Sequence, residues 1–187
     1  MKKILLITVI SFCINLYAEI LIPMDITQSN HLKAYGIAFQ TIKSKGTVKW
    51  LLNYRGGSFI MPEQQSIVSE CNIKGVSFEL IGGAEISAIN DEINQNNMEA
   101  ITLEKEPKIA VYTPPNSNPW DDAVTLALNY AGIDYDKIWD EQVLQGKLKD
   151  YDWIHLHHED FTGQYGKFYG SYRTAPWYIE EVNTNET

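Results

Sequence analysis

Apolar residues in this chain come either in short runs, which are typical of buried strands, or three to four positions apart, which is typical of helices. The two patterns alternate along residues 19–187. The short runs predict strands at Ile20–Met24, Val48–Asn53, Val76–Ile81, Lys108–Tyr112, Asp136–Asp140 and Trp153–His157. The helical spacing predicts helices at His31–Lys45, Glu63–Asn72, Ala84–Gln95 and Trp120–Ala131. This alternation predicts an α/β fold of three layers, with helices on both faces of a mostly parallel sheet.

The first 18 residues have the pattern of an export signal. Two lysines precede an apolar stretch, Ile4–Leu16, that is too short to span a bilayer. Ala18 is a small residue at the expected cleavage point. Cys13 follows a bulky aromatic residue, which does not fit a lipoprotein cleavage box, so we expect no lipid anchor there. The sequence therefore predicts a periplasmic or extracellular protein that begins at Glu19.

The polar segment Asn90–Lys105 divides the mature chain into two α/β units, residues 19–105 and 106–187, which we expect to pack as one globular body. Both units read strand, loop, helix and strand. This similarity has two explanations. The chain contains an internal duplication, or the units are alike only because every α/β fold repeats strand, loop and helix. Without the signal, Cys71 is the single cysteine, which excludes an internal disulfide. Its helical setting predicts a packed core thiol.

The charge of the chain narrows the classes of partner. The sequence has 24 acidic and 15 basic residues, a formal net charge of −9, and no cluster of lysine and arginine. An acidic surface of this kind argues against nucleic acid and against anionic membranes as partners. The phosphate-loop patterns GxxxxGK and GxGxxG are both missing from the sequence. A small polar ligand or a peptide remains the expected partner.

The stretch Tyr151–Asp160 holds three of the four histidines. Strand alternation places His155 and His157 on one face, so both imidazoles point the same way. The candidate catalytic residues are His155, His157, His158, Glu159 and Asp160. A metal site here would use His155, His157 and Glu159, whereas the alternative is a set of half-buried strand histidines bonded to backbone. We predict no cofactor, with a divalent metal as the alternative.

Other candidate binding residues lie in the loops, because ligands of open α/β sheets bind beyond the carboxyl ends of the strands. The planar guanidinium of Arg55 suits a carboxylate or phosphate, and the two glycines that follow it let the backbone approach a ligand. Ordinary turn chemistry explains the same residues equally well. We expect Arg55 and the histidine cluster to share one cleft. The predicted ligand-binding residues are Asp25, Asn53, Arg55, Gly56, Gly57, Asn118, Trp120, Gln164 and Tyr165.

Four segments together resemble a family of exported proteins of Bacteroidetes-type bacteria that are often labelled asparagine synthetase B. The segments are Ile22–Asp25, His31–Gly36, Trp50–Gly57 and Leu156–Phe168. Family members are longer, so the resemblance implies that residues 19–187 are an N-terminal portion. From Lys108 onward the chain is also similar to class I glutamine amidotransferase-like domains. That similarity implies a flavodoxin-like three-layer fold, of which this chain would hold an incomplete version.

The residues do not support the chemistry in the family's label. A glutamine-dependent asparagine synthetase uses a cysteine directly after the initiator methionine, where this chain has Lys2, and an ATP-binding SGGxDS loop, which the sequence lacks. The first interpretation is therefore an exported protein that binds a small polar or peptide ligand without asparagine synthetase chemistry. One alternative is an amidotransferase-like or metal-assisted hydrolase that uses residues 155–160. Another is a structural half-domain of a secreted assembly, whose aromatic tail, Tyr165–Tyr178, docks on a missing C-terminal half or a partner chain.

Overall fold

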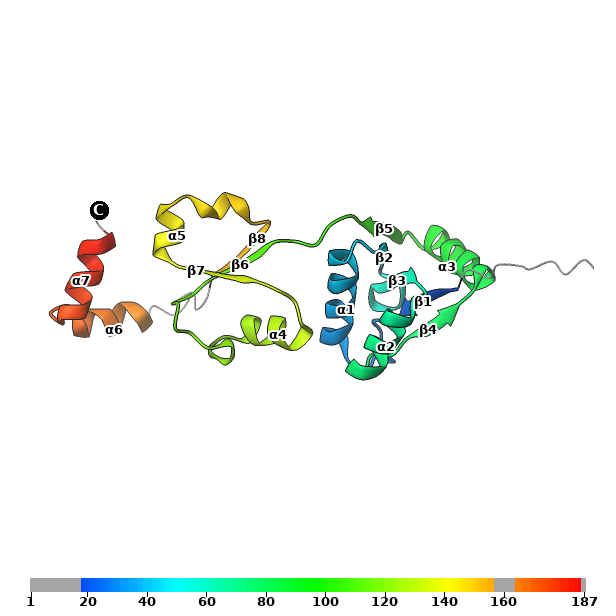
Figure 1. Cartoon of the computed structure of the whole chain (residues 1–187), viewed down its shortest axis with the longest axis horizontal. Coiled ribbons are helices and arrows are strands. Elements are labelled where there is room, and N and C mark those ends of the chain that lie inside the picture. Colours follow the sequence, from blue (N-terminus) through cyan, green and yellow to red (C-terminus); the bar gives the residue numbers. More distant parts are fainter. Residues whose placement is uncertain (1–17, 157–163, 186–187) are drawn as a thin grey trace, which may run out of the picture. The chain divides into compact units, whose positions relative to one another are not determined.

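The structure is a computed structural model that describes residues 18–156 and 164–185. This part of the chain is a mixed α/β protein with two sheets (Figure 1). It forms two compact units: the residues up to Pro107 together with Leu126–Asp134, and Lys108–Thr125 together with the residues from Tyr135 onward. Each unit contains one of the two sheets.

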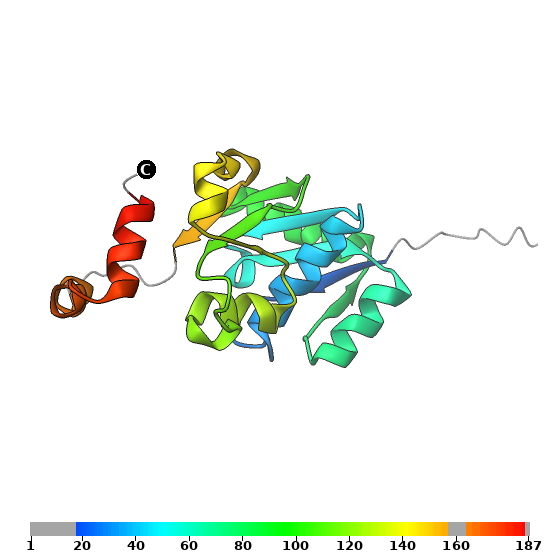
Figure 2. The ribbon, with the colours of Figure 1, turned by 60° about the vertical axis from the view of Figure 1, so that its left-hand side comes forward.

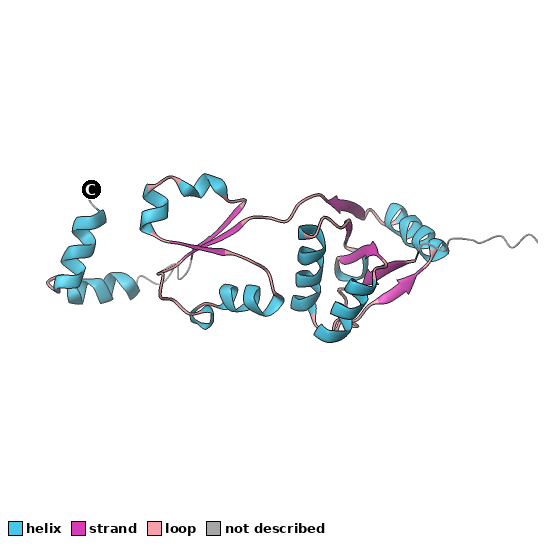
Figure 3. Ribbon diagram, in the orientation of Figure 1, coloured by secondary structure: helices cyan, strands magenta, loops and turns pink. Residues whose placement is uncertain are grey.

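The first unit is built on a five-stranded sheet in the order β4-β1-β3-β2-β5. Its strands are β1 (Glu19–Ile22), β2 (Val48–Leu52), β3 (Ser58–Pro62), β4 (Glu79–Ile81) and β5 (Glu99–Leu103). Its helices are α1 (His31–Lys43), α2 (Gln65–Lys74) and α3 (Gly83–Gln95), shown in Figure 3. Every neighbouring pair of these strands is antiparallel.

The mostly parallel sheet that we predict is therefore wrong for this unit, and β3 is the reason. The sequence prediction missed β3, although its short apolar run after a turn of two glycines is typical of the second strand of a hairpin. Only residues 53–57 join β2 to β3. A connection that short makes a hairpin, and a hairpin pairs its strands antiparallel. Since β1 and β2 both pair with β3, they run in the same direction as each other.

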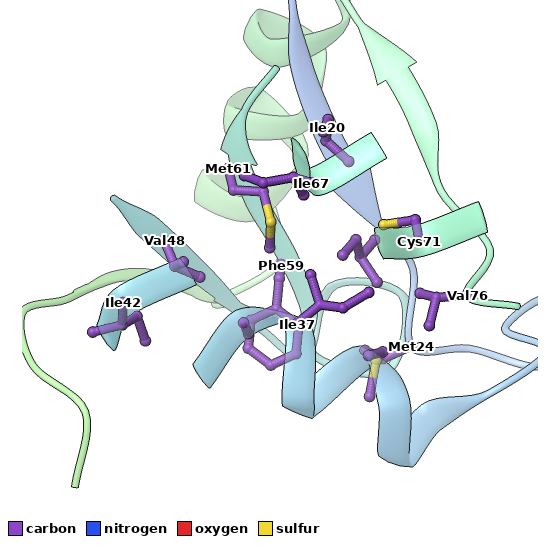
Figure 4. Close-up of a cluster of buried hydrophobic side chains, with 13 residues drawn as sticks. Ile20, Met24, Ile37, Ile42, Val48, Phe59, Met61, Ile67, Cys71 and Val76 are labelled. Atoms are coloured by element: carbon purple, nitrogen blue, oxygen red, sulfur yellow. The ribbon is translucent and has the colours of Figure 1, made fainter. Parts of the chain in front are cut away.

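Helices cover both faces of this sheet. Ile20 and Ile22 of β1 pack against α1 and α2, whereas Leu21 points to the opposite face, toward α3. Figure 4 shows the cluster on the α1–α2 face. Cys71 of α2 is fully buried in it, which confirms the predicted core thiol, and burial raises its pKa to about 11. The first unit thus has the predicted helices on both faces, although its sheet is antiparallel.

One glycine fixes how closely α1 meets its neighbour in this unit. The second half of α4 (Ala123–Ala131) belongs to the first unit and packs on α1. A Cβ at Gly36 would lie 1.8 Å from the carbonyl oxygen of Ala131. Any larger residue at this crossing would therefore push the two helices apart.

The second unit contains a three-stranded sheet in the order β7-β6-β8, in which both neighbouring pairs are parallel. Its strands are β6 (Ile109–Tyr112), β7 (Asp136–Ile138) and β8 (Trp153–Leu156). α4 connects β6 to β7, and α5 (Asp140–Leu144) precedes β8, as Figure 2 shows. The parallel arrangement that we predict is confirmed for this unit.

The aromatic segment near the end of the chain is helical. It contains α6 (Gln164–Tyr172) and α7 (Pro176–Asn185), which the sequence pattern does not predict. The two helices meet through their rings, with centroids 5.9 Å apart for Tyr172 and Trp177 and 6.3 Å apart for Tyr169 and Trp177. Within the described ranges, no helix combines the length and the apolar character that crossing a membrane requires.

Candidate functional site

The parallel sheet brings His155 and Thr113 to the same place. His155 of β8 is the register partner of Val111 of β6. Register partners in a parallel pair point to the same face, and successive residues alternate between faces. Thr113, two residues after Val111, therefore faces the same side as His155. Because carboxyl ends of parallel strands meet at one edge, both side chains stand at the carboxyl edge of this sheet.

Asp122, the residue directly before α4, reaches the same point. Its Oδ1 atom lies 3.3 Å from Nε2 of His155, close enough for an ion pair with a protonated imidazole but not aligned as a hydrogen bond. The same oxygen accepts the backbone N–H groups of Val124 (2.7 Å) and Thr125 (2.9 Å). The Asp122 side chain is only 12% exposed and that of His155 only 21%. Asp122 thus caps α4 and holds the start of that helix against β8.

The electrostatic surroundings keep Asp122 ionised. Burial alone would raise the pKa of its carboxyl group. The backbone N–H of Thr125, the imidazole of His155 and the backbone N–H of Val124 outweigh that burial, so the pKa is lowered. A partly buried carboxylate therefore lies beside an imidazole at the carboxyl edge.

Two polar atoms at this edge lack hydrogen-bond partners. Thr113 is 1% exposed, and its Oγ1 atom has no hydrogen-bond partner among residues 18–156 and 164–185. Nε2 of His155 has no aligned hydrogen bond either, and its contact is the one with Asp122 at 3.3 Å. The backbone of Thr113 is held, because its N–H donates to the carbonyl of Ile138 at 3.0 Å. Buried polar atoms are nearly always bonded, and an unsatisfied one costs about 1–3 kcal/mol. We therefore take these unsatisfied polar atoms, at the carboxyl edge of the parallel sheet, as the candidate functional site.

Arg55, the other predicted centre of binding, lies in the first unit. Its Nε donates to Asp25 (2.8 Å), its Nη1 to Glu79 (2.8 Å) and its Nη2 to the Thr27 hydroxyl (3.2 Å). The structure thus brings together Asp25 and Arg55, which we predict as binding residues. They meet because β1 and β2 run in the same direction and end at the same edge.

The cleft that we predict between Arg55 and the histidines rests on one shared parallel sheet, and that premise is wrong. Arg55 follows β2 of the antiparallel sheet, whereas His155 belongs to β8 of the parallel sheet. The charge of Arg55 is also matched by two carboxylates of its own unit. Its hydrogen bond to Asp25, above all, raises the pKa of Arg55. Hydrogen bonds from Thr27 and then from Arg55 lower the pKa of Asp25 to about 2.

The glycines after Arg55 allow a close approach, and the group that approaches is the chain itself. Gly56 has a φ of 81°, and a Cβ there would lie 2.4 Å from the carbonyl oxygen of Met24. Asn53 and Arg55 also have positive φ angles, 65° and 44°. The backbone N–H of Met24 donates to the Arg55 carbonyl at 3.1 Å. These contacts fasten the β2–β3 loop, residues 53–57, to the loop after β1.

The remaining predicted residues divide between the β6–α4 loop and the part of the chain that is not described. Asn118 and Trp120 lie in the β6–α4 loop with Asp122, and Trp120 is 70% exposed. Gln164 and Tyr165 begin α6, but their side chains are outside the described part. His157, His158, Glu159 and Asp160 also lie outside the described residues.

The structure adds residues that the sequence reasoning missed. Asp122 carries a readable signal, since an aspartate directly before a helix is a common N-cap. Glu79 and Thr113 carry none, because their roles depend on strand neighbours that are distant in the sequence. A metal site is not seen within the described ranges, where no three His, Cys, Asp or Glu side chains gather. Two of its three predicted ligands, His157 and Glu159, lie outside those ranges.

Comparisons of the chain with models of protein families, with curated proteins and with solved structures found no match in any of the three.

Proposed function

We propose that this chain is an exported α/β protein that binds a small polar or peptide ligand at the carboxyl edge of its parallel sheet, through Thr113, Asp122 and His155. The observation that carries the proposal is the buried Oγ1 of Thr113, which has no hydrogen-bond partner in the described part of the chain, beside Nε2 of His155, whose 3.3 Å contact with Asp122 is not aligned as a hydrogen bond. A ligand that bonds to them removes the cost of leaving them unpaired. Asp122 beside them supplies a fixed negative charge.

The order of the strands supports this place for a ligand. From β6 the chain moves to β7 on one side, and it then crosses to β8 on the other side. Right-handed crossovers in opposite directions place their connections on opposite faces of the sheet. A crevice then forms between the carboxyl ends of β6 and β8, which is where open α/β sheets bind ligands. The order β7-β6-β8 agrees with the first three strands of the flavodoxin-like fold that the amidotransferase-like resemblance implies.

The chemistry of the three groups defines the ligand class. A threonine hydroxyl both donates and accepts, an imidazole donates through one or both nitrogens, and a carboxylate only accepts. A ligand with donors and acceptors close together, such as an amide or a peptide group, satisfies all three. Export to the periplasm or beyond the cell is part of the proposal. β1 begins at Glu19, directly after the proposed cleavage point, so processing there would leave the sheet complete.

A hydrolase is the second candidate, and the Asp122–His155 contact favours it. A carboxylate beside an imidazole is the arrangement that lets histidine act as a general base. Cys71 does not supply the nucleophile, because it is buried and its pKa is raised to about 11. Release of ammonia from glutamine or from alanyl-glutamine, measured with and without His155→Gln, tests this candidate.

Calorimetric titration with L-glutamine, L-asparagine and alanyl-glutamine tests the binding proposal. Asp122→Asn keeps a cap for α4 but removes the charge, and His155→Gln removes the imidazole. Each should weaken binding about tenfold, the equivalent of one hydrogen bond to the ligand. His31→Gln is the matched control, because the His31 ring bonds to carbonyl groups of the first unit, those of Met24 and Asp25. Full binding by both site variants would contradict the proposal.

A further inference from the structure

The parallel sheet has a second concave feature, on the face opposite His155. It is a pocket of about 350 Å³ at the carboxyl ends of β6 and β8. Tyr112 and Asp140 are its two polar residues, and the rest of its lining is aliphatic: Val143, Leu144, Leu148, Ile154 and Leu156. Small-molecule pockets have volumes of about 300–1,000 Å³ and are mostly apolar with a few placed polar groups. This pocket has both properties.

The aliphatic side of the pocket faces water. Leu144 is 74% exposed and Leu156 is 48% exposed, although both are large apolar side chains. Burying such a side chain is worth about 1.5–3 kcal/mol relative to leaving it in water. An apolar group that enters the pocket gains part of that free energy.

The polar end of the pocket is a prearranged carboxylate. The Tyr112 hydroxyl donates to Oδ1 of Asp140, and the Tyr112 ring stacks on Trp139 with centroids 4.7 Å apart and planes at 19°. Burial, and then the bond to Asp140, raise the pKa of Tyr112 to about 12, so the hydroxyl keeps its proton and remains a donor. No donor within the described ranges bonds to the second oxygen, Oδ2 of Asp140. An acidic side chain, oriented by the Tyr112 hydroxyl, therefore belongs to the lining of a mostly apolar pocket.

We propose that this pocket binds a primary ammonium group that carries a short branched aliphatic chain. The ammonium donates to Oδ2 of Asp140, and the aliphatic chain covers the leucines of the lining. The net charge of −9 raises the local concentration of such cations. Two sources share this chemistry, a free amine and the amino terminus of a peptide that begins with leucine. The proposal goes beyond the site on the opposite face and uses none of its residues.

Calorimetric titration of the full chain tests the proposal. The charged probes are 3-methylbutylammonium, L-leucinamide and the peptide Leu-Gly-Gly, and 4-methylpentanamide is the neutral probe of similar shape. The ammonium probes should bind at least about tenfold more tightly than the neutral amide, because only they form a charge-assisted hydrogen bond. Tighter binding of Leu-Gly-Gly than of 3-methylbutylammonium assigns the peptide terminus as the source, and the reverse assigns a free amine.

Matched variants locate the binding. Asp140→Asn keeps an acceptor for Tyr112 and should weaken the ammonium probes about tenfold. Glu141→Gln makes the same change of charge on the next residue of α5, outside the pocket lining, and should leave binding unchanged. Tyr112→Phe keeps the carboxylate and should retain binding, and His155→Gln should have no effect on these probes. Equal affinity for the charged and neutral probes, unchanged binding by Asp140→Asn, or no binding at millimolar probe would overturn the proposal.

Discussion

Two buried polar side chains, Gln28 of the first unit and Thr113 of the second, differ in how far they are hydrogen-bonded. Gln28, in the loop after β1, is 6% exposed and fully bonded. Its amide donates to the carbonyls of Pro23 (2.8 Å) and Ser77 (3.1 Å), and its oxygen accepts the N–H groups of Ser77 (2.9 Å) and Asn30 (3.1 Å). Thr113, directly after β6, is 1% exposed and has no partner for its hydroxyl in the described part of the chain. Gln28 thus joins two loops of the first unit, whereas the Thr113 hydroxyl is the group that we propose a ligand satisfies.

Apolar side chains differ in exposure between interior and edge strands. β1 is an interior strand of its sheet, between β4 and β3, and Ile20, Leu21 and Ile22 are each at most 1% exposed. β8 lies at the edge of its sheet, and Trp153 and Leu156 are 44% and 48% exposed. The exposed apolar side chains at this edge belong to the unit that we propose binds a ligand.

The largest expected effect distinguishes a buried position of the first unit from an exposed position of the second. Ile22→Ala should lower the free energy of unfolding by about 4 kcal/mol, because it leaves a cavity in a packed core. Leu144→Ala, at an exposed position of the second unit, should cost less than about 1 kcal/mol. Urea unfolding followed by circular dichroism measures both. Equal losses for the two variants would break the comparison.

The next effect concerns the loop that Arg55 braces. Gly56→Ala should cost about 3 kcal/mol, because the residue keeps a positive φ and its Cβ would lie 2.4 Å from the Met24 carbonyl oxygen. Gly75→Ala is the control: its φ of 65° is also positive, but no atom lies within 4 Å of the added Cβ. That control should cost only about 1 kcal/mol. A Gly56→Ala protein as stable as the control in urea would show that the loop contact is loose.

A smaller effect depends on pH. Asp25 has a pKa of about 2 in the folded protein, below its ordinary value of 3.8, so the unfolded chain takes up the proton first as the pH falls. The stability that ionised Asp25 contributes is present above pH 3.8 and is lost as the pH falls toward 2. The stability gap between the natural protein and Asp25→Asn should narrow across that window in urea titrations at several pH values. A gap that stays constant would contradict the Arg55–Asp25–Thr27 arrangement.

The parts of the fold that could be predicted are those that a local sequence pattern determines, and the parts that were missed depend on which strands pair. The runs around Ile20, Val48, Ile109 and Trp153 identify β1, β2, β6 and β8, because each is a local apolar pattern. Whether the strands of the first sheet pair parallel or antiparallel depends on β3. This strand follows β2 through one tight loop and lies between β1 and β2. β5 was also missed, because its residues Glu99–Leu103 are mostly exposed and lie in a segment that reads as a polar linker. Because this one hairpin was missed, the prediction gave a parallel sheet where the structure has an antiparallel one.

The residues of the candidate site could likewise be predicted only where a local pattern identifies them. Asp25 and Arg55 could be paired from the sequence, since both follow strands that run in one direction. His155 could be singled out by its residue type and by strand alternation. Thr113 could not, because an unsatisfied hydroxyl is visible only when its three-dimensional surroundings are known. Glu79 matches the charge of Arg55 from β4, whose pairing with β1 no local pattern reveals.

The most direct test of the account replaces the Thr113 hydroxyl with a methyl group and measures stability and binding in the same protein. Thr113→Val should raise the free energy of unfolding by about 1 kcal/mol, because it removes an unsatisfied buried hydroxyl, and it should weaken binding of the best glutamine, asparagine or alanyl-glutamine probe. Thr102→Val, on the exposed strand β5, should change neither quantity. Stability and affinity should therefore change in opposite directions in this variant. A Thr113→Val protein that is less stable than the natural one, or that binds the probe with full affinity, would contradict it.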